Sequence, residues 1–151
     1  MRGPRGFTIL EMAIVMAIAG VLIAITVPRL QNYIDRNRVA QSIVEIGEMS
    51  TKIRQYEVSK AILPASLADA GYGGRLDPWG QPYEFVNLRT SPNSVKARKD
   101  KNLKPLNSDY DLYSIGPDGL TAASLTNSKS RDDVIRARDG SFIGTAEEFD
   151  P

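Results

Sequence analysis

The chain of 151 residues contains no cysteine and no histidine. Without cysteine it has no disulfide, no thiol nucleophile and no thiolate metal site. Without histidine it lacks the side chain that most often serves as a general base. No pairing of a nucleophile with a base stands out among the remaining residues. An enzyme is therefore the least favoured class of protein.

A large excess of one charge is also missing. The chain has 19 Lys and Arg residues against 18 Asp and Glu residues, which gives a formal net charge of +1. No dense basic patch interleaved with aromatic residues is present, so we predict no nucleic-acid partner. The length favours one domain with an appendage.

What the sequence does have is one long apolar run near its start. Phe7 to Val27 contains a single ionisable residue, Glu11. As a helix the run would span roughly 31 Å, close to the thickness of a bilayer's hydrocarbon core. Three interpretations compete. They are a cleaved secretory signal peptide, whose apolar core is normally shorter and free of acids, a plain membrane anchor, and a helix that leaves the bilayer to pack against copies of itself.

The sequence before and after the start of this run supports the third interpretation. A short basic segment, then Gly6-Phe7-Thr8-Ile9-Leu10-Glu11 and the apolar stretch, resembles the leader junction of type IV pilins and type II secretion pseudopilins. The resemblance implies that residues 1–6 are a leader, which a prepilin peptidase removes by cutting between Gly6 and Phe7. The same enzyme would methylate the new amino terminus of Phe7.

The resemblance also implies a partner for the acid. In the assembled filament, Glu11 of one subunit would face the ammonium group of Phe7 on a neighbour. An unpaired buried charge is costly, and a short-range opposite charge offsets much of that cost. Only one axial stagger brings the two groups together, so the pair would also set the register of the subunits. The alternative is a glutamate near a helix end that simply reaches water.

A second helical pattern follows the apolar run and differs from it in having only one apolar face. We predict one helix from about residue 7 to about residue 59, divided into a membrane and filament-core part, 7–28, and an amphipathic part, 29–60, with a kink at Pro28. The apolar face of the second part is formed by residues spaced three or four apart, namely Val39, Ile43, Ile46, Met49, Ile53 and Tyr56. Polar residues between them, Glu45 included, are expected to face water.

Residues 61–151 are predicted to form a globular region of loops and β-strands. The expected strands are 81–88, 110–115, 133–138 and 141–143, preceded by a short helix at 66–70 and a type I turn at 77–80. Trp79 is expected in the core, the basic segment 89–107 in a solvated loop, and the acidic tail 147–151 frayed. The predicted fold class is therefore α+β, a pilin-like fold with one long N-terminal helix packed on a small antiparallel sheet and a long C-terminal loop region.

Two segments of this region narrow the resemblance. Asp77-Pro78-Trp79-Gly80-Gln81-Pro82-Tyr83 and the run from Asp111 to Gly119 are similar to globular-domain motifs of the major pseudopilin of type II secretion. The resemblance implies a homo-oligomeric helical filament whose subunits enter the inner membrane by a single pass, with the globular region in the periplasm. The implied partners are the prepilin peptidase, an inner-membrane assembly platform and minor pseudopilins. A type IV pilin or other extracellular fibre subunit is the first alternative, and a monomeric membrane-anchored binding domain the second.

Major pseudopilins also bind calcium in a C-terminal loop, and the resemblance extends to the residues that would do so. The implied ligands are the backbone oxygens of Leu112 and Ser114 and the carboxylates of Asp118, Asp132 and Asp133, which is suitable chemistry for Ca²⁺. The chain departs from that pattern between residues 120 and 131, where Lys129 and Arg131 add positive charge. A loop held by hydrogen bonds without metal is the competing hypothesis.

Overall fold

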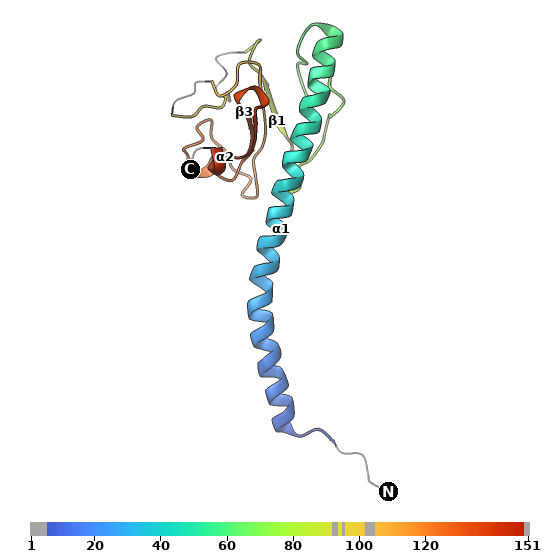
Figure 1. Ribbon diagram of the computed structural model, residues 1–151, viewed down its shortest axis with the longest axis vertical. Helices are drawn as coiled ribbons and strands as arrows, with labels where there is room; N and C mark the ends of the chain where they lie inside the picture. The colour runs from blue at the N-terminus through green and yellow to red at the C-terminus, as the bar shows by residue number, and fades with distance from the viewer. Residues whose placement is uncertain (1–5, 92–93, 95, 102–104, 150–151) are drawn as a thin grey trace. The chain divides into compact units, whose positions relative to one another are not determined.

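The computed structural model describes residues 6–91, 94, 96–101 and 105–149. The chain divides into two compact units, the first ending at Asn37 and the second beginning at Arg38. A single helix, α1 (Ile9–Lys60), contributes to both units (Figure 1). Residues 1–5 of the predicted leader lie outside the described residues.

The first unit is the N-terminal part of α1 and the short segment before it. From Gly6 to Asn37 every side chain is exposed except Ala19, which is half-buried. α1 is the one helix in the described part of the chain that is long and apolar enough to cross a membrane. The helix runs on through Pro28. The kink expected at this proline remains a prediction.

The second unit contains a four-stranded antiparallel sheet with strand order β1-β2-β3-β4. Its strands are β1 (Glu84–Asn87), β2 (Tyr110–Ser114), β3 (Val134–Ala137) and β4 (Phe142–Thr145). The register pairs Phe85 with Leu112, and Tyr113 with Ile135. One long helix with a small antiparallel sheet confirms the predicted α+β, pilin-like architecture.

Side chains from the two faces of the sheet enter two different clusters, because neighbouring residues of a strand point to opposite sides. Leu112 and Val134 pack with Ile46, Met49 and Ile53 of α1. The other face carries a second cluster, which consists of Leu106, Tyr113, Leu125, Ile135, Ala137 and Ala146. The predicted apolar face of the second helical part is thus the surface that meets the sheet, and Figure 1 shows this part of α1 beside it. Trp79 packs, half-buried, against the first cluster, as expected.

Two short segments differ from the sequence-based expectation. Residues 66–70 form hydrogen-bonded turns and no helix, because Gly71, with φ +88°, ends the helical path within one turn. Part of the supposedly frayed tail is ordered as a short helix, α2 (Ala146–Phe149). It is held by the ring of Phe149, whose centroid lies 5.1 Å from that of Phe142. Residues 150 and 151 lie outside the described residues.

The segment 89–107 is a further correction. Within its described residues, Arg98 and Asn107 are buried, so the prediction of a solvated loop is wrong at these positions. The physical reason is that buried polar partners reach both side chains from distant parts of the chain. Asn107, for example, donates to the carbonyl oxygen of Arg136 at 2.9 Å. Two short 3₁₀ turns, η1 (Ser128–Ser130) and η2 (Arg138–Gly140), flank β3.

The packing of α1 on the sheet generates a first prediction. Ile46→Ala should lower the free energy of unfolding by about 2–5 kcal/mol, because Ile46 is fully buried and truncation leaves a cavity. Val44 lies two residues away but is 61% exposed, so Val44→Ala should change the same quantity by no more than about 0.5 kcal/mol. Denaturant unfolding of the full chain in detergent measures both. Equal effects of the two substitutions would contradict the packing described.

Candidate functional site

The residues of the predicted processing and assembly site lie at the start of α1. Gly6 and Phe7 precede the helix, and the Phe7 side chain is 80% exposed. Thr8 donates to Oε2 of Glu11 twice, from its backbone nitrogen at 2.8 Å and from its hydroxyl at 2.9 Å. In return the backbone nitrogen of Glu11 donates to the Thr8 hydroxyl at 3.2 Å. This reciprocal arrangement is a capping box, which satisfies free amide groups at the helix start.

The capping box orients the carboxylate of Glu11, but its donors are neutral groups and supply no opposite charge. Hydrogen bonds from Thr8 orient the carboxylate, and in water they would be enough to stabilise its ionised form. In hydrocarbon an ionised group with no countercharge remains expensive. Sequence reasoning missed Thr8, although the spacing Thr-x-x-Glu before an apolar run is the known signature of this cap. The pairing of Glu11 with the Phe7 ammonium of another subunit stays a prediction.

A second polar cluster joins α1 to the segment before β1. Glu45, only 8% exposed, accepts a hydrogen bond from the Tyr83 hydroxyl at 2.7 Å and one from the Arg75 guanidinium at 2.8 Å. Gln41 donates to the same carboxylate at 3.0 Å. The expectation that Glu45 faces water is therefore wrong, because its partners come from residues 30 and 38 positions further along the chain.

The electrostatics of this cluster fix which groups are charged. Burial opposes ionisation of Glu45, but the hydrogen bonds from Gln41, Tyr83 and Arg75 outweigh it, so its pKa lies below the usual value of 4.5. Burial raises the pKa of the Tyr83 hydroxyl, which therefore stays a neutral donor. The carboxylate form of Glu45 thus links α1 to the globular region of residues 61–151, called the β-region below, at neutral pH.

The residues predicted to bind calcium have different partners in the structure. Leu112 and Ser114 lie in β2, and the Ser114 hydroxyl donates to Asp77. The exposed Asp118 donates from its backbone nitrogen to Oδ2 of Asp132 at 3.3 Å. Asp133 is fully buried and forms an ion pair with Arg98.

A turn after β2 keeps Asp118 near Asp132. Its Gly116 has a φ of +70°, and a Cβ at that position would lie 2.7 Å from the backbone oxygen of Asp132. Burial, with the neighbouring Asp118 adding to it, raises the pKa of Asp132. Burial raises the pKa of Asp133 to about 6, although the Arg98 guanidinium opposes the rise.

These positions do not fit a calcium ion. Ca²⁺ takes six to eight oxygen ligands. No group of three or more acidic side chains that could hold a metal occurs among the residues the structure describes. The Oδ2 atom of Asp133 already accepts from Arg98 and from Thr121. Its Oδ1 is buried and has no hydrogen-bond partner among the described residues, so Asp133 itself would offer a cation one free oxygen.

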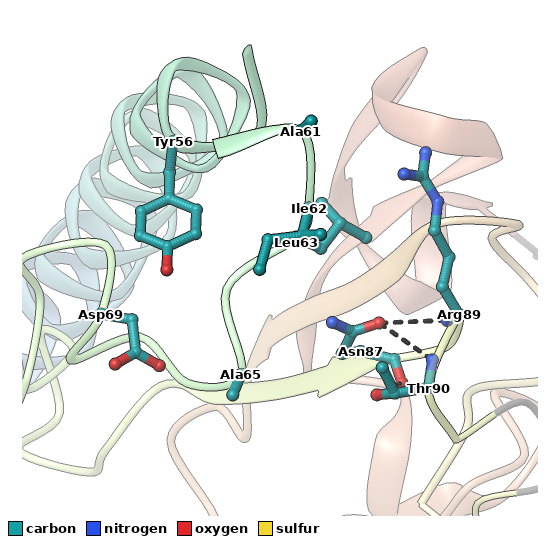
Figure 2. A pocket seen from close by; sticks show the side chains of 9 residues that line it. All are labelled: Tyr56, Ala61, Ile62, Leu63, Ala65, Asp69, Asn87, Arg89 and Thr90. Carbon is teal, nitrogen blue, oxygen red and sulfur yellow. Dashed lines mark hydrogen bonds between the residues drawn. The ribbon is translucent and has the colours of Figure 1, made fainter. Parts of the chain in front are cut away.

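A cavity of about 490 Å³ lies beside the C-terminal end of α1 (Figure 2). Several of its polar side chains form contacts within the chain. Asp69 accepts from Ser66 at 2.9 Å, and Arg89 donates to Glu57 at 2.6 Å. Asn87 accepts from the backbone nitrogens of Arg89 and Thr90, as the dashed lines in Figure 2 show. These groups are turn and surface contacts and do not form a set of reactive side chains.

Comparison with known proteins finds a known motif at the start of the chain. Residues 1–27 match the family model described as the prokaryotic N-terminal methylation motif. A type IV major fimbrial protein FimA of Dichelobacter nodosus is 49% identical over 49 residues, which cover 32% of this chain and 31% of that relative. The chain therefore matches less than a third of the length of that relative.

Other relatives match over most of their length. The type II secretion system core protein G of Escherichia coli (strain K12) is 30% identical over 146 residues, covering 82% of this chain and 90% of that relative. A fimbrial protein of Neisseria meningitidis is 24% identical over 143 residues, covering 94% of this chain and 84% of that relative. No solved structure matches the chain.

The long apolar helix, the small sheet and the methylation motif together define a pilin-like protein. Within that class, the chain belongs to the family of type II secretion system core protein G. The pilin and pseudopilin families consist of structural filament subunits and not of enzymes, in agreement with the expectation from the missing histidine and cysteine.

The buried Glu45 generates a second prediction. The pKa of Glu45 is lower in the folded chain than in the unfolded chain, so its contribution to stability is present above pH 4.5 and is lost as the pH falls through the folded value. Glu45→Gln should therefore lower the free energy of unfolding at pH 7 by about 1–3 kcal/mol. The difference from the unsubstituted chain should shrink below pH 4.5.

Denaturant unfolding at a series of pH values measures this difference. Glu48→Gln, at an exposed position on the same helix, serves as the matched control and should have little effect at any pH. A loss for Glu45→Gln that stays constant down to pH 3 would show that the charge of Glu45 has no part in it.

Proposed function

We propose that this protein is the structural subunit of a pilus-like filament and that it is the major pseudopilin of a type II secretion system. The observation that carries this proposal is the exposed apolar surface from Phe7 to Val27, at the start of α1 and just before it, interrupted by one acid. Such a surface must be buried away from water. The bilayer buries it before assembly, and other copies of the helix bury it after assembly.

Glu11 is the group that favours packing against other subunits over remaining in the bilayer. A lipid environment offers it no countercharge, whereas a neighbouring subunit offers the ammonium of Phe7 once the leader is gone. The attraction between two such charges increases at short range and low dielectric constant. Assembly therefore replaces an uncompensated charge with a compensated one, and it does so only at one axial offset between subunits.

The remaining partners and the location follow from the same proposal. A prepilin peptidase cuts between Gly6 and Phe7 and methylates Phe7. The helix spans the inner membrane once, with the β-region in the periplasm. An assembly platform in that membrane and minor pseudopilins then guide the subunit into the periplasmic filament. The match to core protein G over 82% of the chain supports this assignment.

A type IV pilin is the second candidate. The fimbrial protein of Neisseria meningitidis aligns with 94% of this chain, which favours an extracellular fibre. The two candidates differ in where the filament lies in cells that produce the protein at its natural level. A periplasmic filament whose loss stops secretion fits a pseudopilin, and a surface fibre whose loss leaves secretion intact fits a pilin.

Processing generates a third prediction. Protein isolated from cells that contain a prepilin peptidase should begin at Phe7 and carry one added methyl group on its amino terminus. Intact-mass measurement with N-terminal fragmentation measures both features. Gly6→Ile, at the position before the cut, should leave residues 1–6 attached. Mature protein that retains its first six residues and still forms filaments would contradict the proposed route.

The charge on Glu11 generates a fourth prediction. Glu11→Gln should reduce incorporation into filaments by a factor of 100 or more, because one charge of a buried pair is then left alone at a cost of about 3–5 kcal/mol. Insertion into the membrane should be unchanged or improved. Quantifying the protein in sheared filament and membrane fractions gives the ratio. Glu147→Gln, at an exposed position in α2, is the control and should assemble normally.

A further inference from the structure

We propose that Arg98 is a built-in cation that holds the C-terminal loop region together, and that the β-region consequently needs no calcium ion. The guanidinium group would link distant segments of the loop region as a bound metal ion can, but with a positive charge that belongs to the chain itself. This inference concerns stability and does not depend on which filament the subunit enters.

The first support is the burial of Arg98 and the number of its partners. Its side chain is 1% exposed. One nitrogen, Nη1, donates to the Thr121 hydroxyl at 2.6 Å and to the carbonyl oxygen of Ala122 at 2.7 Å. The other, Nη2, donates to the carboxylate of Asp133. A rigid planar fork of this kind can bind several oxygens at once, which a lysine ammonium cannot do in the same fixed geometry.

The second support is the distance along the chain between the groups that Arg98 joins. Thr121 is 23 residues and Asp133 is 35 residues beyond it. The backbone nitrogen of Arg98 donates to Oδ2 of Asp111 at 2.7 Å, and its guanidinium lies 4.2 Å from the centroid of the Tyr113 ring. One residue therefore connects β2, the long loop after it and the start of β3. Closing loops of this length is the role usually given to a disulfide or a metal ion.

The third support is the charge of the cluster. Asp111 and Asp133 are both fully buried, and Arg98 is in contact with each of them. A divalent cation at the same place would lie beside the guanidinium and repel it. Thr121 also donates to Asp133 at 2.7 Å, so the oxygen that faces the cluster already has two donors. The Oδ2 atom of Asp133 and both carboxylate oxygens of Asp111 are therefore engaged by the chain's own donors.

The test uses the full chain in detergent, stripped of metal with a chelator, and follows thermal unfolding of the β-region. The midpoint Tm should be the same with excess chelator and with millimolar calcium. A ligand present at about 100 times its Kd would raise Tm by several degrees, so the comparison is sensitive. A clear rise of Tm with calcium would overturn the proposal without any substitution being made.

Substitutions at Arg98 test the other half of the proposal. Arg98→Met should lower Tm by roughly 10 °C or more, because Asp133 is left buried without a countercharge. Arg98→Met combined with Asp133→Asn should recover part of that loss. If Arg98→Met does not fold, Arg98→Lys provides the measurement. Lysine keeps the charge but lacks the planar guanidinium group, so Arg98→Lys should have a Tm between those of the unsubstituted chain and Arg98→Met.

A matched control comes from a surface arginine. Arg89 pairs with Glu57 at 2.6 Å, but its side chain is 54% exposed, so Arg89→Met should lower Tm by no more than a few degrees. Equal losses for Arg89→Met and Arg98→Met would overturn the assignment of Arg98 as the central cation.

Discussion

One helix with two different surroundings is the constraint on which the rest of this structure depends. The second part of α1 covers its apolar face with the sheet, where Ile46, Met49 and Ile53 are almost completely buried. The first part has nothing comparable, and among its described residues only Ala19 is even half-buried. Apolar area of this size stays in water only at a large free-energy cost. A protein of this design therefore needs a bilayer or other subunits to complete it.

The same contrast holds for the charges. In the second unit several deeply buried charged side chains have a countercharge from a distant segment. Arg136 is an example: its Nη1 donates to Oδ1 of Asp109 at 2.8 Å and its Nη2 donates to Oδ2 at 2.7 Å. Among the described residues of the first unit, Glu11 accepts from the hydroxyl and the amide of Thr8, which are neutral groups. A charge satisfied by neutral donors alone is stable in water and unstable in hydrocarbon. Glu11 therefore differs from the paired charges of the second unit, such as Arg98 with Asp133.

The parts of the fold that local pattern determines could be predicted from the sequence. The apolar positions at helical spacing predicted the buried face of α1, and short strand-like segments predicted the four strands of the described sheet. Glu45 and Arg98 were misplaced in water because each is buried by partners 30 or more residues away, and no local pattern records such a pairing. Thr8 is a different case. Its partner is three residues away, so the Thr-x-x-Glu spacing contained the signal and only its meaning was overlooked.

Buried ion pairs explain how a body without disulfides holds long loops in one arrangement. Such pairs add little net stability, because desolvation cancels most of the attraction. They act by destabilising other conformations of the loops, because a loop that moves away leaves a charge uncompensated inside the protein. Arg98 and Arg136 each stack on a tyrosine of β2, Tyr113 and Tyr110, which lie on opposite faces of the sheet. Arg98 thus joins the segment before β2, and Arg136 joins β3, to the same strand.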